Sequence, residues 1–250
     1  MNSTTDSFIN ELQSFLPERK KPKVGRPPVP TKAILHELFK LLKTNCGWRN
    51  INHKTTCHQF LKEIQRRGLL QKFFNVMTNA LVENRPAKSI VDSSDIVSYR
   101  VKPEVRYSGK YHNYCLKMTV EVNEDFVPLT WSIDYGSKPD SLILDSLLQK
   151  QRKIPYEMYL DKGYERRERR RELKAQNCQV RMEMKKGKNR KRGKRFQFTQ
   201  EDKEVRSSIE KFFGWLKSFM SLRLNRFRKK SMIIAAFLFA LNYYTLMRLN

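Results

Sequence analysis

The sequence predicts an α/β protein in which a mixed sheet flanked by helices follows a small all-helical domain. Residues 31–85 carry apolar side chains at helical spacing, three strand-like segments follow in a row, and helix-like and strand-like segments then alternate. We therefore divide the 250 residues into a basic flexible arm (1–30), a helical domain (31–85) and a sheet domain (86–250).

The arm contributes to a large positive charge. The chain has 51 Lys and Arg against 25 Asp and Glu, a formal net charge of +26, which attracts polyanions such as nucleic acid. The segment "PERKKPKVGRPPVPTK" has too little apolar surface to fold alone. In its "GRPP" stretch, Arg26 before Pro27 could enter a narrow minor groove of DNA. A plain proline-rich linker is an equally good interpretation.

The helical domain is predicted to contain three helices. Apolar residues recur at helical spacing from Ile34 to Leu42, and this helix should end near Gly47. The segment "CHQFLKEIQRRGLLQKFFNVMTNALVE" repeats the pattern in two helices broken near Gly68. Such a unit with basic faces is consistent with helix-turn-helix DNA binding, although helical bundles without DNA have the same pattern.

The sheet domain should begin with three strands, "KSIVDSSDIVSYRV", "NYCLKMTVEVN" and "FVPLTWSIDYG". A helix, "SLILDSLLQKQRK", a strand, "YEMYLDKGY", a basic helix, "RRERRRELKAQ", and a short strand, "QVRMEM", follow. Two further helices start near Thr199 and Ser231. Residues 185–198 are nearly all basic and are predicted to form a loop.

The last twenty residues approach the length that spans a bilayer. Asn242 inside this run and Arg248 near its end favour a helix buried in protein, with a membrane anchor as the alternative. Four scattered cysteines without a signal peptide indicate a reducing compartment.

Three carboxylates in apolar contexts are the candidate catalytic residues. Asp92 and Asp161 come at the predicted ends of strands, and Glu210 lies on a helix. Carboxylates at the ends of neighbouring strands converge in the crevice where α/β sheets bind ligands. Converging carboxylates repel unless a cation lies between them, and their oxygens favour Mg²⁺ or Mn²⁺. Metal-assisted phosphoryl transfer is the expected chemistry; ordinary surface ion pairing is the alternative.

The helix around Glu210 has an apolar stripe from Val205 to Met220. Glu210 lies at its border, with Arg206 one turn before it and Lys217 two turns after it on the same side. This arrangement suits a metal ligand flanked by two phosphate-binding cations, although Arg and Glu at this spacing also form ordinary helix pairs.

These motifs resemble the DDE transposases of bacterial insertion sequences, in the branch typified by insertion sequence five. The matching stretches are "GRPPVPTKAILHELFKLLKTNCGWRNI", "IVDSSDI", "YLDKGYE" and "VRSSIEKFFGWLKSF". The resemblance implies an RNase H-like core in which Asp92, Asp161 and Glu210 bind two Mg²⁺ or Mn²⁺ ions. It also implies that Arg206 and Lys217 contact DNA. The family signature has a tyrosine where Lys203 stands here.

Several nearby residues have secondary expectations. Lys117 and Lys162 are further candidate DNA contacts, and Tyr164 is considered for the same role. For Lys162 and Tyr164, exposure to solvent or packing in the protein is the alternative. Gly163 is expected to permit a tight turn. Asp95 and Asp140 compete for ligand roles, but we assign Asp95 to the polar face of a strand and Asp140 to a helix N-cap.

The expected function is that of a DNA transposase, which cuts element ends by water attack and joins the freed 3′-hydroxyl to target DNA. Its partners would be double-stranded DNA, as terminal inverted repeats and target, and a second copy of the chain. It would act beside the nucleoid in the cytoplasm, or in the nucleus of a eukaryotic host. An RNase H-like nuclease and an inactive, domesticated DNA-binding protein are the alternatives.

Overall fold

A computed structural model of the protein describes residues 3–19, 27–82, 85–98, 105–109, 112–150, 153–183 and 197–249. The chain forms two compact units. One, the helical unit, contains residues 1–77, a short segment from Val97 and residues 216–250, and the other, the sheet unit, contains residues 78–96 and 105–215. Arg26 and residues 185–196 of the predicted basic loop lie outside the described residues.

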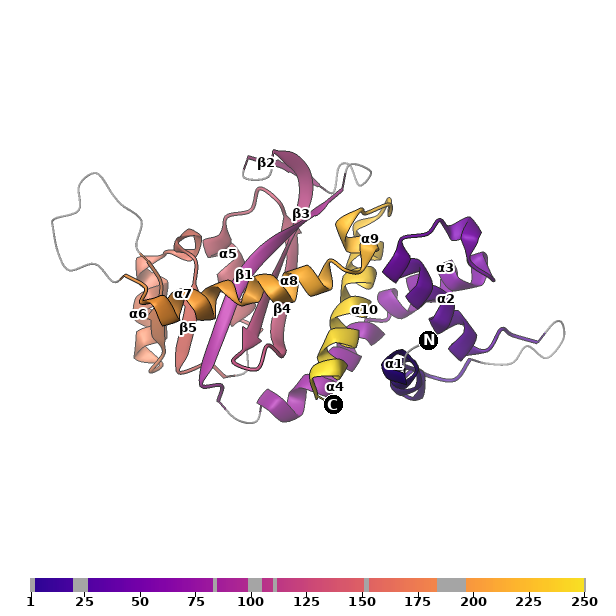
Figure 1. The fold of residues 1–250 in the computed structure, drawn as a ribbon, viewed down its shortest axis with the longest axis horizontal. Helices are drawn as coiled ribbons and strands as arrows, with labels where there is room; N and C mark the ends of the chain where they lie inside the picture. Colours follow the sequence, from indigo (N-terminus) through magenta and orange to yellow (C-terminus); the bar gives the residue numbers. More distant parts are fainter. Residues whose placement is uncertain are drawn as a thin grey trace. The chain divides into compact units, whose positions relative to one another are not determined.

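The helical unit confirms the predicted helices (Figure 1). Its elements are α1 (Ser3–Phe15), α2 (Thr31–Thr44), the 3-10 turn η1 (Trp48–Asn50), α3 (Lys54–Arg66), the first part of α4 (Leu69–Val82), α9 (Met220–Arg223) and α10 (Lys230–Leu249). The break between α3 and α4 lies at Gly68, whose φ of 64° is one that glycine adopts easily.

The expectation of a flexible arm over residues 1–30 is wrong for its first half. Residues Ser3–Phe15 form α1, whose buried side chains Phe8, Ile9 and Leu12 make one apolar stripe. The ring of Phe8 meets that of Phe239 in α10 edge to face, with centroids 5.2 Å apart. This amphipathic pattern gives α1 the apolar surface that the following Pro- and Lys-rich segment lacks.

Helix α10 is buried in protein, as predicted. By length and composition it could also cross a membrane, but α1, α3 and α9 pack against it. Asn242 is fully buried and its Nδ2 donates a hydrogen bond to the Leu70 carbonyl oxygen at 2.9 Å. These partners belong to the helical unit, so the compact sheet unit does not coincide with the predicted domain of residues 86–250.

The sheet unit contains a mixed sheet, which confirms the predicted α/β architecture. Its strands are β1 (Lys88–Val97), β2 (Arg106–Ser108), β3 (Asn113–Asn123), β4 (Pro128–Tyr135), β5 (Glu157–Leu160) and β6 (Gln179–Arg181). They run in the order β2-β3-β1-β5-β6, with β4 paired to β3. Strand β3 is antiparallel to β2 and β4, whereas β5 is parallel to β1 and β6. The short strand β2 was not predicted.

The helices of the sheet unit are α5 (Asp140–Leu148), η2 (Lys162–Tyr164), α6 (Arg167–Ala175), α7 (Gln200–Ser207) and α8 (Ile209–Leu216). Met158 and Leu160 of β5 share one apolar cluster with residues of α5 and α6. The helix predicted from Thr199 is divided into α7 and α8, which follow one another across the strands in the view of Figure 1.

Candidate active site

The register between β1 and β5 brings Asp92 and Asp161 to neighbouring positions. The two strands are parallel, and their pairing ends with Val91 opposite Leu160. One residue further along each strand lie Asp92 and Asp161. Asp161 keeps an extended backbone, with φ −73° and ψ 154°, and adjacent strands lie about 4.8 Å apart. Asp92 and Asp161 therefore occupy adjacent positions on neighbouring strands.

Both carboxylates lie on the face of the sheet that α7 covers. Side chains alternate along a strand, so Asp161 points away from the cluster that buries Met158 and Leu160. Helix α7 packs against β5. From α7, Nη2 of Arg206 lies 3.6 Å from Oδ1 of Asp161.

Asp92 lies inside β1 and not at its end, which corrects the prediction. Its Oδ1 accepts a hydrogen bond from the Ser93 backbone amide at 2.8 Å. The polar run "DSSD" does not end the strand because its short side chains form hydrogen bonds. The Ser93 hydroxyl lies 2.7 Å from Thr119 Oγ1 and 2.6 Å from the Tyr164 hydroxyl.

Glu210 is the second residue of α8 and is exposed. Ser208, between α7 and α8, keeps helical dihedrals of −61° and −25°, so Arg206 and Glu210 share one helical face at a spacing of four residues. In the part of the chain that the structure describes, no three His, Cys, Asp or Glu side chains gather closely enough to hold a metal ion. The structure thus pairs Asp92 with Asp161 and leaves Glu210 outside that pair.

The remaining predicted cations differ in exposure. Lys162 is exposed and directly follows Asp161. Lys203 is exposed on α7, one turn before Arg206. Lys217 directly follows α8 and belongs to the helical unit.

Lys117 is only 6% exposed. Its Nζ lies 2.8 Å from Oδ1 of Asp140 and donates to the Lys138 carbonyl oxygen at 2.8 Å, so its position does not favour a direct DNA contact. The N-cap prediction for Asp140 is wrong: Pro139 is the N-cap of α5, and Asp140 is the first helical residue, whose carboxylate pairs with Lys117.

Tyr164 is buried, so the expectation that it faces DNA is wrong. Burial raises the pKa of its hydroxyl well above the usual range, and the nearby Asp140 carboxylate adds to that pKa shift. Its hydroxyl and Ser93 connect η2 to β1 beneath the carboxylates. Packing was the alternative expected for Tyr164, and the structure favours it.

Gly163 is explained by close approach and not by a left-handed turn. Among the described glycines, only Gly68 has a positive φ. A Cβ atom on Gly163 would lie 2.8 Å from Oδ2 of Asp140. The glycine therefore lets the residues after Asp161 pass close to α5.

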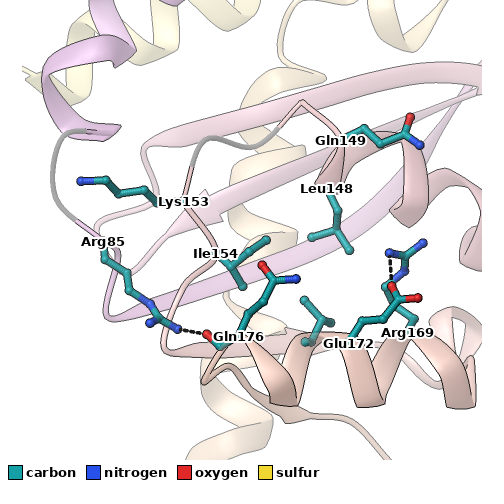
Figure 2. A pocket seen from close by; sticks show the side chains of 9 residues that line it. Arg85, Leu148, Gln149, Lys153, Ile154, Arg169, Glu172 and Gln176 are labelled. Carbon is teal, nitrogen blue, oxygen red and sulfur yellow. Dashed lines mark hydrogen bonds and ion pairs between the residues drawn. The ribbon is translucent and has the colours of Figure 1, made fainter.

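None of these residues line a cavity of about 440 Å³ on the sheet unit, whose lining side chains Figure 2 shows. Its charged groups already have protein partners. Arg85 Nη2 donates to the Gln176 carbonyl oxygen at 2.9 Å, and Arg169 Nη1 donates to Glu172 Oε2 at 2.7 Å. Arg85 thus compensates the negative end of α6, which is a structural role.

Comparison with known proteins points to one class of enzyme. A family model described as "Transposase DDE domain" matches residues 83–246. A cryo-EM structure of the piggyBac transposase, in a synaptic complex with hairpin DNA, is similar in fold with a TM-score of 0.52 and 8% sequence identity. That similarity covers 98% of this chain and 71% of the piggyBac chain. No curated protein sequence matches this one.

Proposed function

Because the chain belongs to the family of transposase DDE domains, we propose that it cuts DNA at the ends of a mobile element and joins them to target DNA. In the cut, a water oxygen bonds to the phosphorus of the terminal phosphodiester, and the bond from phosphorus to the 3′-oxygen breaks. In the joining step, the released 3′-hydroxyl attacks a target phosphodiester and displaces the 3′-oxygen of the target strand.

The contact between Arg206 and Asp161, at 3.6 Å, is the observation that carries this proposal. It ties the helix pair that bears Glu210 to the strand end that bears Asp161, and Asp92 follows in register on the adjacent strand. Neighbouring elements on one face of the sheet thus bear all three predicted catalytic carboxylates, which supports an RNase H-like core.

The carboxylates fit Mg²⁺ or Mn²⁺ by their chemistry. Asp92 and Asp161 offer hard oxygen donors side by side, and a cation stabilises like charges in this arrangement. Glu210, although outside the pair, would be the third ligand. Two such ions, when bound, activate the attacking oxygen and stabilise the leaving oxygen of a phosphodiester.

Cationic side chains near the carboxylates would hold the DNA backbone. Lys162 is exposed beside Asp161, and Arg206 can exchange its carboxylate partner for a phosphate of the same charge. Lys217 would bind a further phosphate. We assign Lys117 a positioning role instead, because it holds Asp140 against the turn at Gly163.

The spacing of Arg206, Glu210 and Lys217 supports placement in the branch typified by insertion sequence five, with Lys203 replacing the signature tyrosine. Since two element ends must be held together, the chain would act as a homodimer on the terminal repeats. The synaptic DNA complex of the piggyBac transposase is consistent with such an assembly. The protein would act wherever the host keeps its DNA.

The proposal is tested with full-length protein, Mg²⁺ and a plasmid that carries the gene with its own flanking DNA. Sequencing should find new 3′-hydroxyl ends and joined products. Asp161→Asn and Glu210→Gln should abolish both, whereas Glu201→Gln, which changes an exposed carboxylate of α7, should not. Nicks without joined products would favour a nuclease. DNA binding without either product would favour an inactive DNA-binding protein.

A further inference from the structure

The helical unit contains a cavity of about 830 Å³ that the proposed reaction does not use. The end of α2, the turn η1, α3 and the segment leading into α10 surround it. Asn45 follows α2 in left-handed backbone, with a φ of 54°, and its Nδ2 donates to the Leu224 carbonyl oxygen at 2.6 Å. This bond ties α2 to the segment before α10. The volume lies within the usual range for small-molecule sites.

The charged side chains that line this cavity are all cations: Arg49, Lys62, Arg226, Arg228 and Lys229. All five are exposed. Among the described residues none of them takes part in an ion pair, and no carboxylate lines the cavity. The first turn of α10 also lines it, adding the positive end of a helix dipole. The cavity therefore attracts a ligand with several negative charges.

One wall of the cavity is aromatic. Trp48 meets His58 edge to face with ring centroids 5.1 Å apart, and Phe227 with centroids 6.5 Å apart. His58 is exposed and Trp48 is half-buried, and Leu41 and Met232 extend the apolar lining. A flat ring can stack on such a wall.

We propose that this cavity binds one unpaired nucleotide of the DNA substrate, with its base against Trp48 and its phosphates on the surrounding cations. Cations alone would suit any duplex backbone. Bases paired inside a duplex cannot reach a concave aromatic site, whereas an extruded or single-stranded base can. An unpaired nucleotide matches both features of the cavity, because its base can stack on the aromatic wall and its phosphates can contact the five cations, which have no carboxylate partners among the described residues. This inference rests on the proposed function for the source of the DNA.

The test measures binding by the full-length protein without divalent ions. The probes are a paired duplex, the same duplex with one unpaired thymidine, and free thymidine monophosphate as competitor. We expect the unpaired thymidine to tighten binding by about tenfold or more. Trp48→Ala should remove this preference and Trp48→Phe should keep it. Arg228→Gln, which changes an exposed side chain, should weaken binding of the duplex with the unpaired thymidine without affecting folding.

Equal affinity for both duplexes would overturn the inference, as would a preference that survives in folded Trp48→Ala protein or undiminished binding of the unpaired probe by Arg228→Gln. Competition by micromolar free nucleotide would also overturn it, because the cavity would then be a site for free nucleotides. The binding assay contains no divalent ions, so its result does not depend on whether the protein joins DNA in the plasmid assay. Conversely, equal affinity for the duplexes leaves the transposase proposal standing.

Discussion

At the scale of single residues, the candidate site depends on close packing behind the carboxylates. Lys117 lies 2.8 Å from Asp140, and a Cβ atom on Gly163 would lie 2.8 Å from Asp140 Oδ2, so one of them would have to shift. The Tyr164 hydroxyl forms a hydrogen bond with the hydroxyl of Ser93, the neighbour of Asp92. These contacts fix the backbone on both sides of the Asp92 and Asp161 pair.

Gly163→Ala should therefore destabilise the protein. Its Cβ would lie 2.8 Å from Asp140 Oδ2, and overpacking of this kind costs about 1–3 kcal/mol. Gly214→Ala is the matched control, since nothing lies within 4 Å of its added Cβ and alanine favours a helix by about 1 kcal/mol. Chemical denaturation measures both; equal free energies of unfolding for Gly163→Ala and wild type would contradict the packing described.

Tyr159 should make stability depend on pH at the alkaline end. Burial, with the Glu157 carboxylate nearby, raises the pKa of Tyr159 to about 12, against about 10 in an unfolded chain. The folded state then binds the Tyr159 proton more tightly than the unfolded chain does. The resulting contribution to the free energy of unfolding is complete below pH 10 and is lost as the pH rises to about 12. Denaturation from pH 9 to 12 should give a shallower decline for Tyr159→Phe; parallel curves would refute this assignment.

At the scale of secondary-structure elements, α7 determines where Arg206 lies. Thr199 and Asp202 form a capping box, with hydrogen bonds of 3.1 and 3.0 Å between each side chain and the other's backbone amide. The cap fixes where the helix begins, and α7 then packs against β5.

Thr199→Ala should cost about 1 kcal/mol of stability, as for other lost N-caps, and should reduce DNA cleavage more than DNA binding. Thr199→Ser keeps the hydroxyl and should restore both. Thermal unfolding, together with the plasmid assay, measures these effects. Wild-type stability in Thr199→Ala would show that the cap contributes nothing.

The sequence predicted the elements well because their apolar periods are local. Strands β3 to β5 and helices α5 and α6 fall where alternation and helical spacing place them. Asp92 was misplaced because a polar run usually ends a strand, and here Thr119 and Tyr164, from distant segments, satisfy Ser93. Such long-range partners have no local signal.

At the scale of the whole molecule, two parts of the chain distant in sequence form one unit. Helix α10 packs with α1 and α3, so a linear division at residue 85 could not describe the helical unit. The three candidate carboxylates stand out in the sequence because acidic residues are scarce in a chain of charge +26. The pairing of Asp92 with Asp161 required the register of β1 and β5.

The central claim is that Asp92, Asp161 and Glu210 act as one metal-binding set. It is tested most directly by titrating full-length protein with Mn²⁺ in the presence of DNA and measuring bound ions by electron paramagnetic resonance. We predict that Asp161→Asn and Glu210→Gln each weaken Mn²⁺ binding at least about tenfold, as expected for lost ligands, while Glu201→Gln does not. Binding unchanged in both variants would contradict the claim.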